Sequence, residues 1–154
     1  MIGRFLTQAE LKLAESVFGG AIDYDSVRIA NHKWAFFQPK ATVMAPRGAI
    51  HFNPRGDLYC DDFCAGDMGD KGLFIHEMTH VWQHQCGVNL LLRRHPFCRY
   101  SYTLKPGWPL TRYGIEQQAE IVRHYFLLRE GKAVPGALGV KAYRGLLPFE
   151  GKTG

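Results

Sequence analysis

The chain has 154 residues, of which 46% are hydrophobic and 21% are charged. This length and composition are typical of one globular domain and exclude a disordered or fibrous protein. No apolar run approaches the roughly 18 residues that cross a bilayer, and the N-terminal segment lacks the apolar centre of a signal peptide. We therefore expect one domain over residues 1–154, cytoplasmic as synthesised and without a membrane span.

The net charge of +5 comes from the half of the chain that follows residue 77. The basic side chains of that half are scattered and form no continuous run, which favours an ordinary solvated surface. A basic surface can also bind acidic partners such as nucleic acid or anionic envelope material. We expect the solvated surface, so nucleic acid is not an expected partner.

Four cysteines, Cys60, Cys64, Cys86 and Cys98, are too few for a disulfide scaffold in a chain of this length. The spacing of Cys60 and Cys64 could serve a metal, but no second pair completes a four-ligand zinc pattern. Spectator thiols, or a bridge formed after transport to an oxidising compartment, are the favoured interpretations. The redox state of the four thiols stays open.

The first expected element is a helix near the N-terminus. Thr7 followed three residues later by Glu10 is a capping-box pattern, and the apolar positions after it continue to Gly19. Four β-prone segments follow, separated by proline and glycine turns: 26–30, 33–38, 41–45 and 48–52. They predict a small, largely antiparallel sheet, with Trp34, Phe36 and Phe37 in its core.

The second half of the chain predicts two longer helices. An acidic, glycine-rich loop over residues 56–72 leads into a histidine-rich helix that ends at Gly87, and a second helix covers residues 112–130 with Gly131 as its stop. A strand over residues 99–104 is expected between them. The tail, residues 138–149, predicts a last short helix.

The sequence HEMTH, residues 76–80, carries the clearest chemical signal. Side chains advance by about 100° per residue around a helix, so His76 and His80 share one face and Glu77 lies a quarter turn away. Two imidazoles one turn apart can bind one zinc ion, and the glutamate can then act as the general base on a water molecule. His84 is about 12 Å along the axis from His76 and cannot share that ion.

A third ligand must come from elsewhere in the chain. The longer pattern that adds a histidine after HExxH fails here, because Gln83 stands at its glycine and Cys86 at its last histidine. In the second helix Glu116 and Glu120 lie one turn apart on one face. We assign Glu116 as the third ligand of a single Zn²⁺, and Glu120 as the acceptor that orients a ligand imidazole through its other N–H.

Each signal alone has a common structural explanation, since paired glutamates on a helix are usually solvated. The combination of both helices makes a residue-complete zinc site, which favours the metal. A donor that stabilises the transition state is less defined. The chemically able side chains are Tyr100, Tyr102, Tyr113, His95 and His124, with Tyr113 slightly favoured because it is expected on the Glu116 face.

FIHEMTHVWQHQ followed by YGIEQQAEIVRHYF resembles the gluzincin-type zincin metallopeptidases. More closely, these segments, together with LTQAELKLAESVFGGAIDYDSVRI and ATVMAPRGAIHF, resemble small Vgr-related proteins and the metallopeptidase toxin domains of type VI secretion spike proteins. The resemblance implies an α+β zincin-like fold in which His76, His80 and Glu116 bind zinc and Glu77 is the general base. Glu120 stands where many relatives have aspartate.

The resemblance implies a zinc metallopeptidase that hydrolyses peptide bonds, acting as an antibacterial effector of type VI secretion. Its partners would be a protein or peptide substrate, a secretion spike protein and an immunity protein, and delivery outside the cell or to a target periplasm would need no signal peptide. Two alternatives stay open: a non-catalytic zinc-containing adaptor of a spike, and a protease acting on nucleic-acid-bound proteins.

Overall fold

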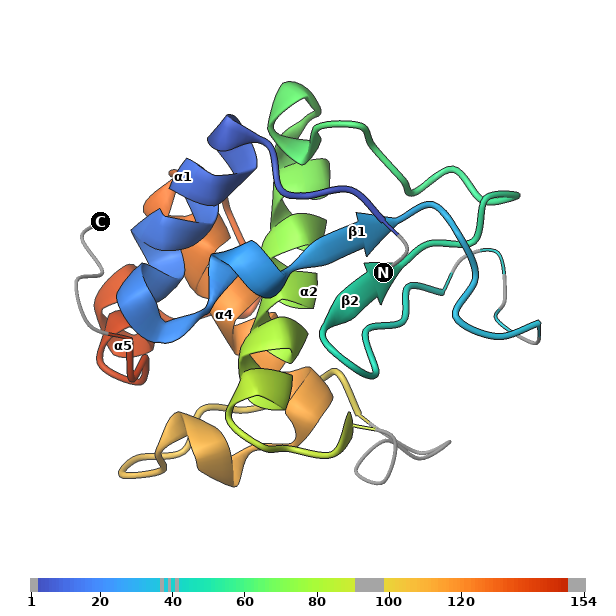
Figure 1. The fold of residues 1–154 in the computed structure, drawn as a ribbon. Helices are drawn as coiled ribbons and strands as arrows, with labels where there is room; N and C mark the ends of the chain where they lie inside the picture. The colour runs from blue at the N-terminus through green and yellow to red at the C-terminus, as the bar shows by residue number, and fades with distance from the viewer. Residues whose placement is uncertain (1–2, 37, 39, 41, 91–98, 150–154) are drawn as a thin grey trace.

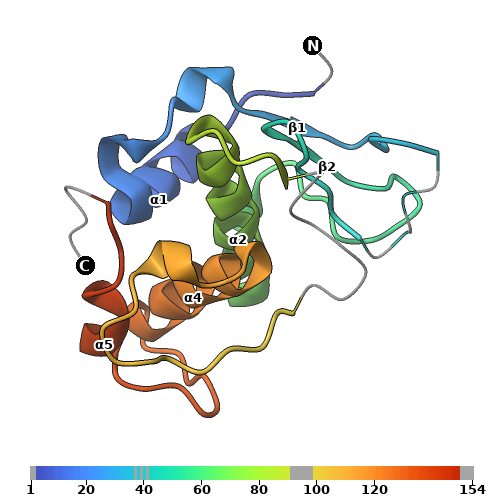
Figure 2. The same cartoon turned by 90° about the horizontal axis from the view of Figure 1, so that it is seen from below.

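The computed structural model describes residues 3–36, 38, 40, 42–90 and 99–149 of a small α+β domain. Its main helices and strands, in chain order, are α1 (Gln8–Phe18), β1 (Arg28–Ala30), β2 (Ala49–His51), α2 (Met68–Gln85), α4 (Ile115–Arg129) and α5 (Val140–Arg144). α2 runs through the middle of the molecule, and α4 crosses it on the side away from the two strands (Figures 1 and 2). In those ranges no helix has the length and apolar character that crossing a membrane requires.

α1 begins with the predicted capping box. The Thr7 hydroxyl accepts a hydrogen bond from the Glu10 N–H at 3.0 Å, and the Glu10 carboxylate accepts one from the Thr7 N–H at 2.9 Å. The same buried carboxylate accepts hydrogen bonds from two Arg4 nitrogens at 2.8 and 3.0 Å and from the Phe63 N–H at 2.9 Å. Because a buried charge is costly unless it is paired, Arg4 offsets the cost of burying Glu10. The helix ends at Gly19, as predicted.

α2 starts inside the segment for which the sequence predicts a loop. The Asp67 carboxylate accepts a hydrogen bond from the Asp70 N–H at 2.9 Å, and the Asp70 carboxylate accepts one from the Asp67 N–H at 3.2 Å. This reciprocal cap starts the helix at Met68. The predicted end is confirmed, because Gly87 follows the last turn with a φ of 92° that favours glycine.

One side of α2 packs against aromatic side chains of the core. The Phe63 ring lies 6.0 Å from the Phe74 ring and 5.4 Å from the Phe52 ring, and both pairs are stacked. Near the other end of the helix, Trp82 meets the edge of Phe149 at 5.0 Å. Burying a side chain of this size contributes about 1.5–3 kcal/mol, so these contacts fix one face of α2 in place.

The sheet is parallel, so the prediction of a largely antiparallel sheet is wrong. β1 and β2 run in the same direction with Ile29 opposite Ile50. The reason is the connection over residues 31–48, which carries the chain back to the end at which β1 began (Figure 1). Among the described residues, antiparallel pairing is confined to two isolated bridges, Arg4 with Ile29 and Met44 with His51.

Two of the four predicted strand segments contain strands, 26–30 with β1 and 48–52 with β2. The described part of segment 33–38 forms no strand, and segment 41–45 contributes a single bridge at Met44. These two segments belong to the long connection, which extends beyond the end of the short sheet. Within the described residues, the one backbone pairing of this connection with a strand is that of Met44 with His51 of β2.

The expected aromatic core of the sheet is also wrong where it can be assessed. The Phe36 side chain is 88% exposed and Trp34 is half-buried, while Phe37 lies outside the described residues. Their position in the connection explains this, because no helix of the described residues covers that loop (Figure 1). The core lies instead around α2, with α1, α4 and the strands on its sides.

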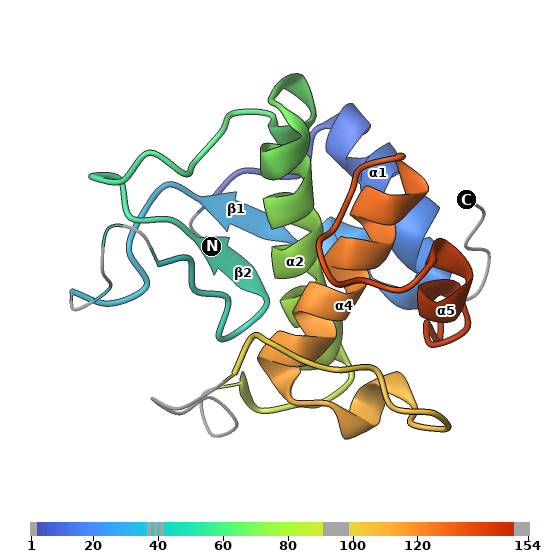
Figure 3. The ribbon, with the colours of Figure 1, turned by 180° about the vertical axis from the view of Figure 1, so that it is seen from behind.

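The predicted strand over residues 99–104 is absent, and the segment crosses α4 as an extended trace (Figure 3). Its backbone is bonded by side chains: the Ser101 carbonyl accepts a hydrogen bond from the Gln117 amide at 2.8 Å, and the Lys105 N–H donates one to the Tyr113 hydroxyl at 2.9 Å. Side chains alternate between more buried and exposed positions along it. That alternation resembles a strand in the sequence, although no second strand pairs with it within the described residues.

α4 begins three residues later than the sequence predicts. The Gly114 N–H donates to the side-chain oxygen of Gln117 at 2.9 Å, and this contact caps the helix so that it starts at Ile115. The predicted stop is confirmed by Gly131, with a φ of 81°. α5 is the short helix expected within residues 138–149, and it packs against α4.

Candidate metal centre

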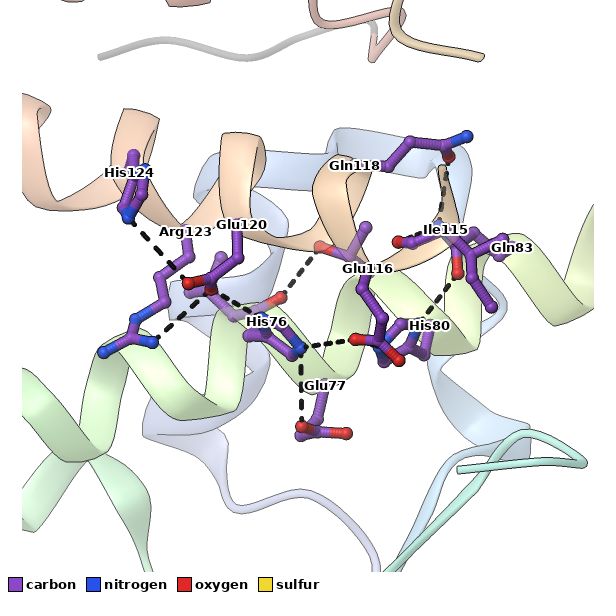
Figure 4. A network of polar contacts seen from close by, with 12 residues as sticks. His76, Glu77, His80, Gln83, Ile115, Glu116, Gln118, Glu120, Arg123 and His124 are labelled. Carbon is purple, nitrogen blue, oxygen red and sulfur yellow. Dashed lines mark hydrogen bonds and ion pairs between the residues drawn. The ribbon is translucent and has the colours of Figure 1, made fainter. Parts of the chain in front are cut away.

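Three potential ligands of one metal ion meet where α2 faces α4. His76 and His80 come from α2 and Glu116 from the first turn of α4, and their ligand atoms lie within 4.8 Å of one another. One Glu116 oxygen, Oε1, lies 3.2 Å from His76 Nε2 and 2.9 Å from His80 Nε2 (Figure 4). All three residues are buried. Two imidazole nitrogens and a carboxylate are a donor set that suits Zn²⁺.

The start of α4 is held against α2 by two glutamines that the sequence analysis did not assign. The Gln83 side-chain amide donates to the Ile115 carbonyl and to the Gln118 side-chain oxygen, each at 3.0 Å. The Gln118 amide donates to the Tyr113 carbonyl at 2.8 Å. These buried contacts place Glu116 opposite the imidazoles. The available sequence signal was the position of Gln83, three residues after His80 on the histidine side of the helix.

The second nitrogen of each imidazole also has a partner. His76 Nδ1 lies 2.8 Å from Glu120 Oε2, and His80 Nδ1 lies 2.8 Å from Gln83 Oε1. Because both partners are acceptors, each Nδ1 donates a proton to its partner, and Nε2, which faces Glu116, is the nitrogen that would bind a metal ion after losing its own proton. Glu120 therefore lies beside His76 and accepts the hydrogen bond of its Nδ1.

The carboxylates change the acidity of the buried imidazole beside them. Burial acts to lower the pKa of His76, but its hydrogen bonds with Glu116 and Glu120 outweigh burial and raise that pKa to about 10. Burial acts to raise the pKa of Glu116, yet its hydrogen bonds with His76 and His80 hold that pKa far below its usual range. The pKa of Glu120 is lowered in the same way by its hydrogen bond with His76, against the opposing effect of burial. A divalent cation would therefore take the place of a proton.

Glu77 lies next to this group on the side away from α4 (Figure 4). Its carboxylate is 3.9 Å from His76 Nε2, and the residue is 5% exposed. The carboxylate is thus close to the three ligand atoms without being one of them. This is the position from which a carboxylate can hold or accept a proton of a water molecule beside the metal.

Tyr113 precedes α4 and does not share the Glu116 face that the sequence analysis expected for it. Its hydroxyl is engaged by the Lys105 N–H. Tyr100 lies nearer to the ligands, with its ring stacked on the His76 ring at 6.0 Å and an interplanar angle of 18°. Among the other able side chains, Tyr102 and His124 are hydrogen-bonded to each other, whereas His95 lies outside the described residues.

The three cysteines that the structure describes take no part in this group. Cys60, Cys64 and Cys86 are free thiols, and Cys98 lies outside the described residues. Burial raises the pKa of the Cys64 thiol to about 11, so it stays protonated at neutral pH. Within the described ranges, the three candidate ligands on α2 and α4 make the one cluster of histidine, cysteine and acidic side chains that could hold a metal ion.

Comparison with known proteins gives two relevant similarities, although no family model matches the sequence. The chain is 47% identical over 135 residues to the type VI secretion system spike protein VgrG2b of Pseudomonas aeruginosa, and the match covers 81% of this chain and 13% of that protein. The solved structure of the effector domain of Pseudomonas aeruginosa VgrG2b superposes with a TM-score of 0.78 at 42% identity, covering 93% of this chain and 80% of the other.

Proposed function

The chain belongs to the family of the VgrG2b effector domain, and from this premise we propose that it is a zinc-dependent peptidase acting as a type VI secretion effector. The observation that carries the chemistry is the convergence of His76, His80 and Glu116 beside the buried carboxylate of Glu77. The substrate class is protein or peptide. A zincin-like arrangement of the two helices is part of the same proposal.

Each candidate ligand has a separate role in binding the ion. His76 and His80 offer their Nε2 atoms because Glu120 and Gln83 hold the protons on Nδ1. Glu116 supplies the third donor and a negative charge. Three protein ligands leave one coordination position of a zinc ion open for water. A zinc ion held by these side chains would act as a Lewis acid and lower the pKa of that water to about 7.

Glu77 is the general base of the proposed reaction. Its carboxylate is near the ligands but is not needed to complete the donor set, so it can accept the proton of the attacking water and pass it to the leaving amine. A purely structural metal site has no use for such a group. This distinction separates a peptidase from the alternative of a non-catalytic adaptor.

The biological role is also a proposal, and it is based on the family to which the chain belongs. The name of the relative describes a spike protein, so a spike partner, delivery into a target cell and an immunity protein that protects the producer are proposed for this chain. The chain spans 13% of the length of that relative. The proposal therefore concerns the effector activity alone and not the other parts of a spike.

The test is the substitution Glu77→Gln in the full chain, loaded with one equivalent of zinc and assayed on a peptide library. We expect a loss of about 10²- to 10⁴-fold in kcat/KM, with zinc content and fold unchanged, because general-base catalysis contributes that much. The matched control is Glu15→Gln on the exposed side of α1, which should keep full activity.

Two outcomes would reject the proposal. A Glu77→Gln protein as active as the Glu15→Gln control would remove the general base. A zinc-loaded wild-type protein that cleaves no peptide and unfolds when the metal is chelated would indicate the adaptor, because structural zinc contributes directly to folding.

A further inference from the structure

A chain of polar side chains leads away from the candidate metal centre through Glu120. The Tyr102 hydroxyl lies 2.6 Å from His124 Nδ1 and 2.8 Å from the Tyr143 hydroxyl. His124 Nε2 is 4.0 Å from Glu120 Oε1, and the other oxygen of Glu120 accepts the hydrogen bond of His76 Nδ1 at 2.8 Å. The extended segment before α4, α4 itself and α5 thus meet behind one candidate ligand.

The acceptor at the Glu120 end sets the direction of these hydrogen bonds. A carboxylate can only accept, so the His124 nitrogen that faces Glu120, Nε2, is the one that carries the proton. His124 Nδ1 is then an acceptor, and Tyr102 must donate its hydroxyl proton to it. Tyr143 in turn donates to Tyr102. Burial helps to keep this arrangement, since it raises the pKa of the Tyr102 phenol and Tyr102 remains a donor.

Glu120, His124 and Tyr102 are only partly buried, so hydrogen bonding helps to orient them. Glu120, His124 and Tyr102 line an open pocket of about 380 Å³ together with residues 134–137, whereas Tyr143, which also reaches this pocket, is packed in the core. Side chains that border a cavity are in contact with other atoms on one side only. Their rotamers, and the tautomer of His124, therefore depend on the bonds they make with one another.

Glu120 connects these hydrogen-bonded side chains to His76 of the candidate metal centre. Its Oε2 is shared by His76 Nδ1 at 2.8 Å and Arg123 Nη1 at 3.4 Å, while its Oε1 faces the His124 Nε2. The 4.0 Å separation is longer than a hydrogen bond, and a water molecule or a small rotation can close it. A His124 ring with its proton on Nδ1 would present a lone pair to the carboxylate and repel it.

We propose that Tyr102 is a positioning residue for the metal centre: it fixes the tautomer of His124, which holds Glu120 against His76, and Tyr143 holds Tyr102 in turn. The proposal rests on the metal site of the proposed function. It adds residues on α5 and on the segment before α4 to the set that determines how tightly the ion is bound. None of them touches the ion.

The experiment measures zinc affinity by competition with a chromogenic chelator, and the visible absorption of the Co²⁺-loaded protein. Partners that directly orient a ligand change metal affinity by about 10- to 100-fold. Tyr102 acts two residues further out, through His124 and Glu120, so for Tyr102→Phe we expect zinc binding about threefold to tenfold weaker and a shifted cobalt spectrum. The control is Tyr24→Phe, whose hydroxyl donates to the Gly19 carbonyl at 2.7 Å near the end of α1 and should not affect either reading.

A double-mutant cycle separates positioning from packing. In a His124→Phe background the Tyr102→Phe change should cost less than about twofold in affinity, because its route to Glu120 is gone. An equal loss in both backgrounds, or a Tyr102→Phe affinity equal to that of Tyr24→Phe, would overturn the proposal. Tyr143→Phe leaves the bond between Tyr102 and His124 in place and should weaken zinc binding less than Tyr102→Phe. A larger loss for Tyr143→Phe would contradict the proposed order, in which Tyr143 acts on the metal centre only through Tyr102.

These readouts are independent of hydrolysis. If the wild type binds zinc but cleaves no peptide while the affinities change as expected, the positioning role stands and the peptidase proposal fails. If the wild type binds neither Zn²⁺ nor Co²⁺, both proposals fail together.

Discussion

The two sides of α2 are both buried, but by different kinds of partner. On one side Phe74 and Trp82 pack against aromatic rings of the core. On the other side His76 and His80 meet the carboxylates of α4. The first side depends on area removed from water, which has no directional requirement, whereas the second requires a partner for every polar atom. α2 therefore has one face that tolerates changes of side-chain shape and one face on which each polar atom needs a particular partner.

The comparison predicts that the two sides can be damaged separately. The largest effect is expected on the aromatic side, where Phe74→Ala should reduce the free energy of unfolding by about 3–5 kcal/mol. Zinc affinity of the molecules that remain folded should stay within about threefold of the wild type, since no ligand or ligand partner is removed. Denaturant unfolding and chelator competition measure the two quantities.

The control for this change is Phe5→Ala, which removes the same side chain at a position that is 62% exposed. Phe5 lies under the Arg28 guanidinium at 3.6 Å, so its loss should cost less than about 1 kcal/mol. If Phe74→Ala were to abolish zinc binding at temperatures where the protein is folded, the two sides of α2 would be one cooperative unit.

The next effect is expected on the polar side. Glu116→Gln keeps the size of the side chain and an oxygen acceptor, but it removes the charge that would balance the metal. We expect zinc binding about 10²-fold weaker or more, because structural zinc sites gain about 10–16 kcal/mol from four ligands together. Glu130→Gln, at the exposed end of α4, is the matched control. Equal affinities for the two variants would show that Glu116 is not a ligand.

The same comparison explains which parts of the molecule could be predicted from the sequence. Helix ends and the HExxH pattern depend on residues a few positions apart, and the capping box of Thr7, the stops at Gly87 and Gly131 and the meeting of Glu116 with the histidines agree with the structure. These signals are local or repeat within one helix. They do not depend on which other segment lies against them.

The features that the sequence analysis missed depend on distant partners. The burial of Glu10 requires Arg4 and the Phe63 N–H, and the placement of α4 requires the contact of Gln83 with Gln118. The direction of the sheet depends on the path of a long connection, which short β-prone segments do not specify. α2 is buried on both sides, so it lacks the exposed polar face of a surface helix. The burial of its histidine side depends on the position of α4, which lies far along the chain.

A smaller effect concerns pH and acts on the polar side alone. The hydrogen bonds with Glu116 and Glu120 outweigh burial and raise the pKa of His76 to about 10, so the zinc-free protein holds a proton there at neutral pH. Zinc must displace this proton. Affinity should therefore fall about tenfold, or 1.4 kcal/mol, for each unit by which the pH decreases between about 9 and 7. Zinc affinities measured across this range, with proton release followed in a weakly buffered solution, test the expectation, and an affinity independent of pH would contradict it.

The smallest effect is expected where α2 begins, away from both partners. Asp67→Ala removes the side chain that caps the Asp70 N–H and should reduce the free energy of unfolding by about 1 kcal/mol. Asp67→Asn keeps an accepting oxygen and should cost only a few tenths of that amount, so the pair separates the hydrogen bond from the charge. His76 lies two turns further along the helix, and neither variant should change zinc affinity by more than about twofold. A larger change in affinity would mean that fraying at Met68 reaches the histidines, and that the aromatic contacts of Phe74 do not isolate the metal centre from the end of the helix.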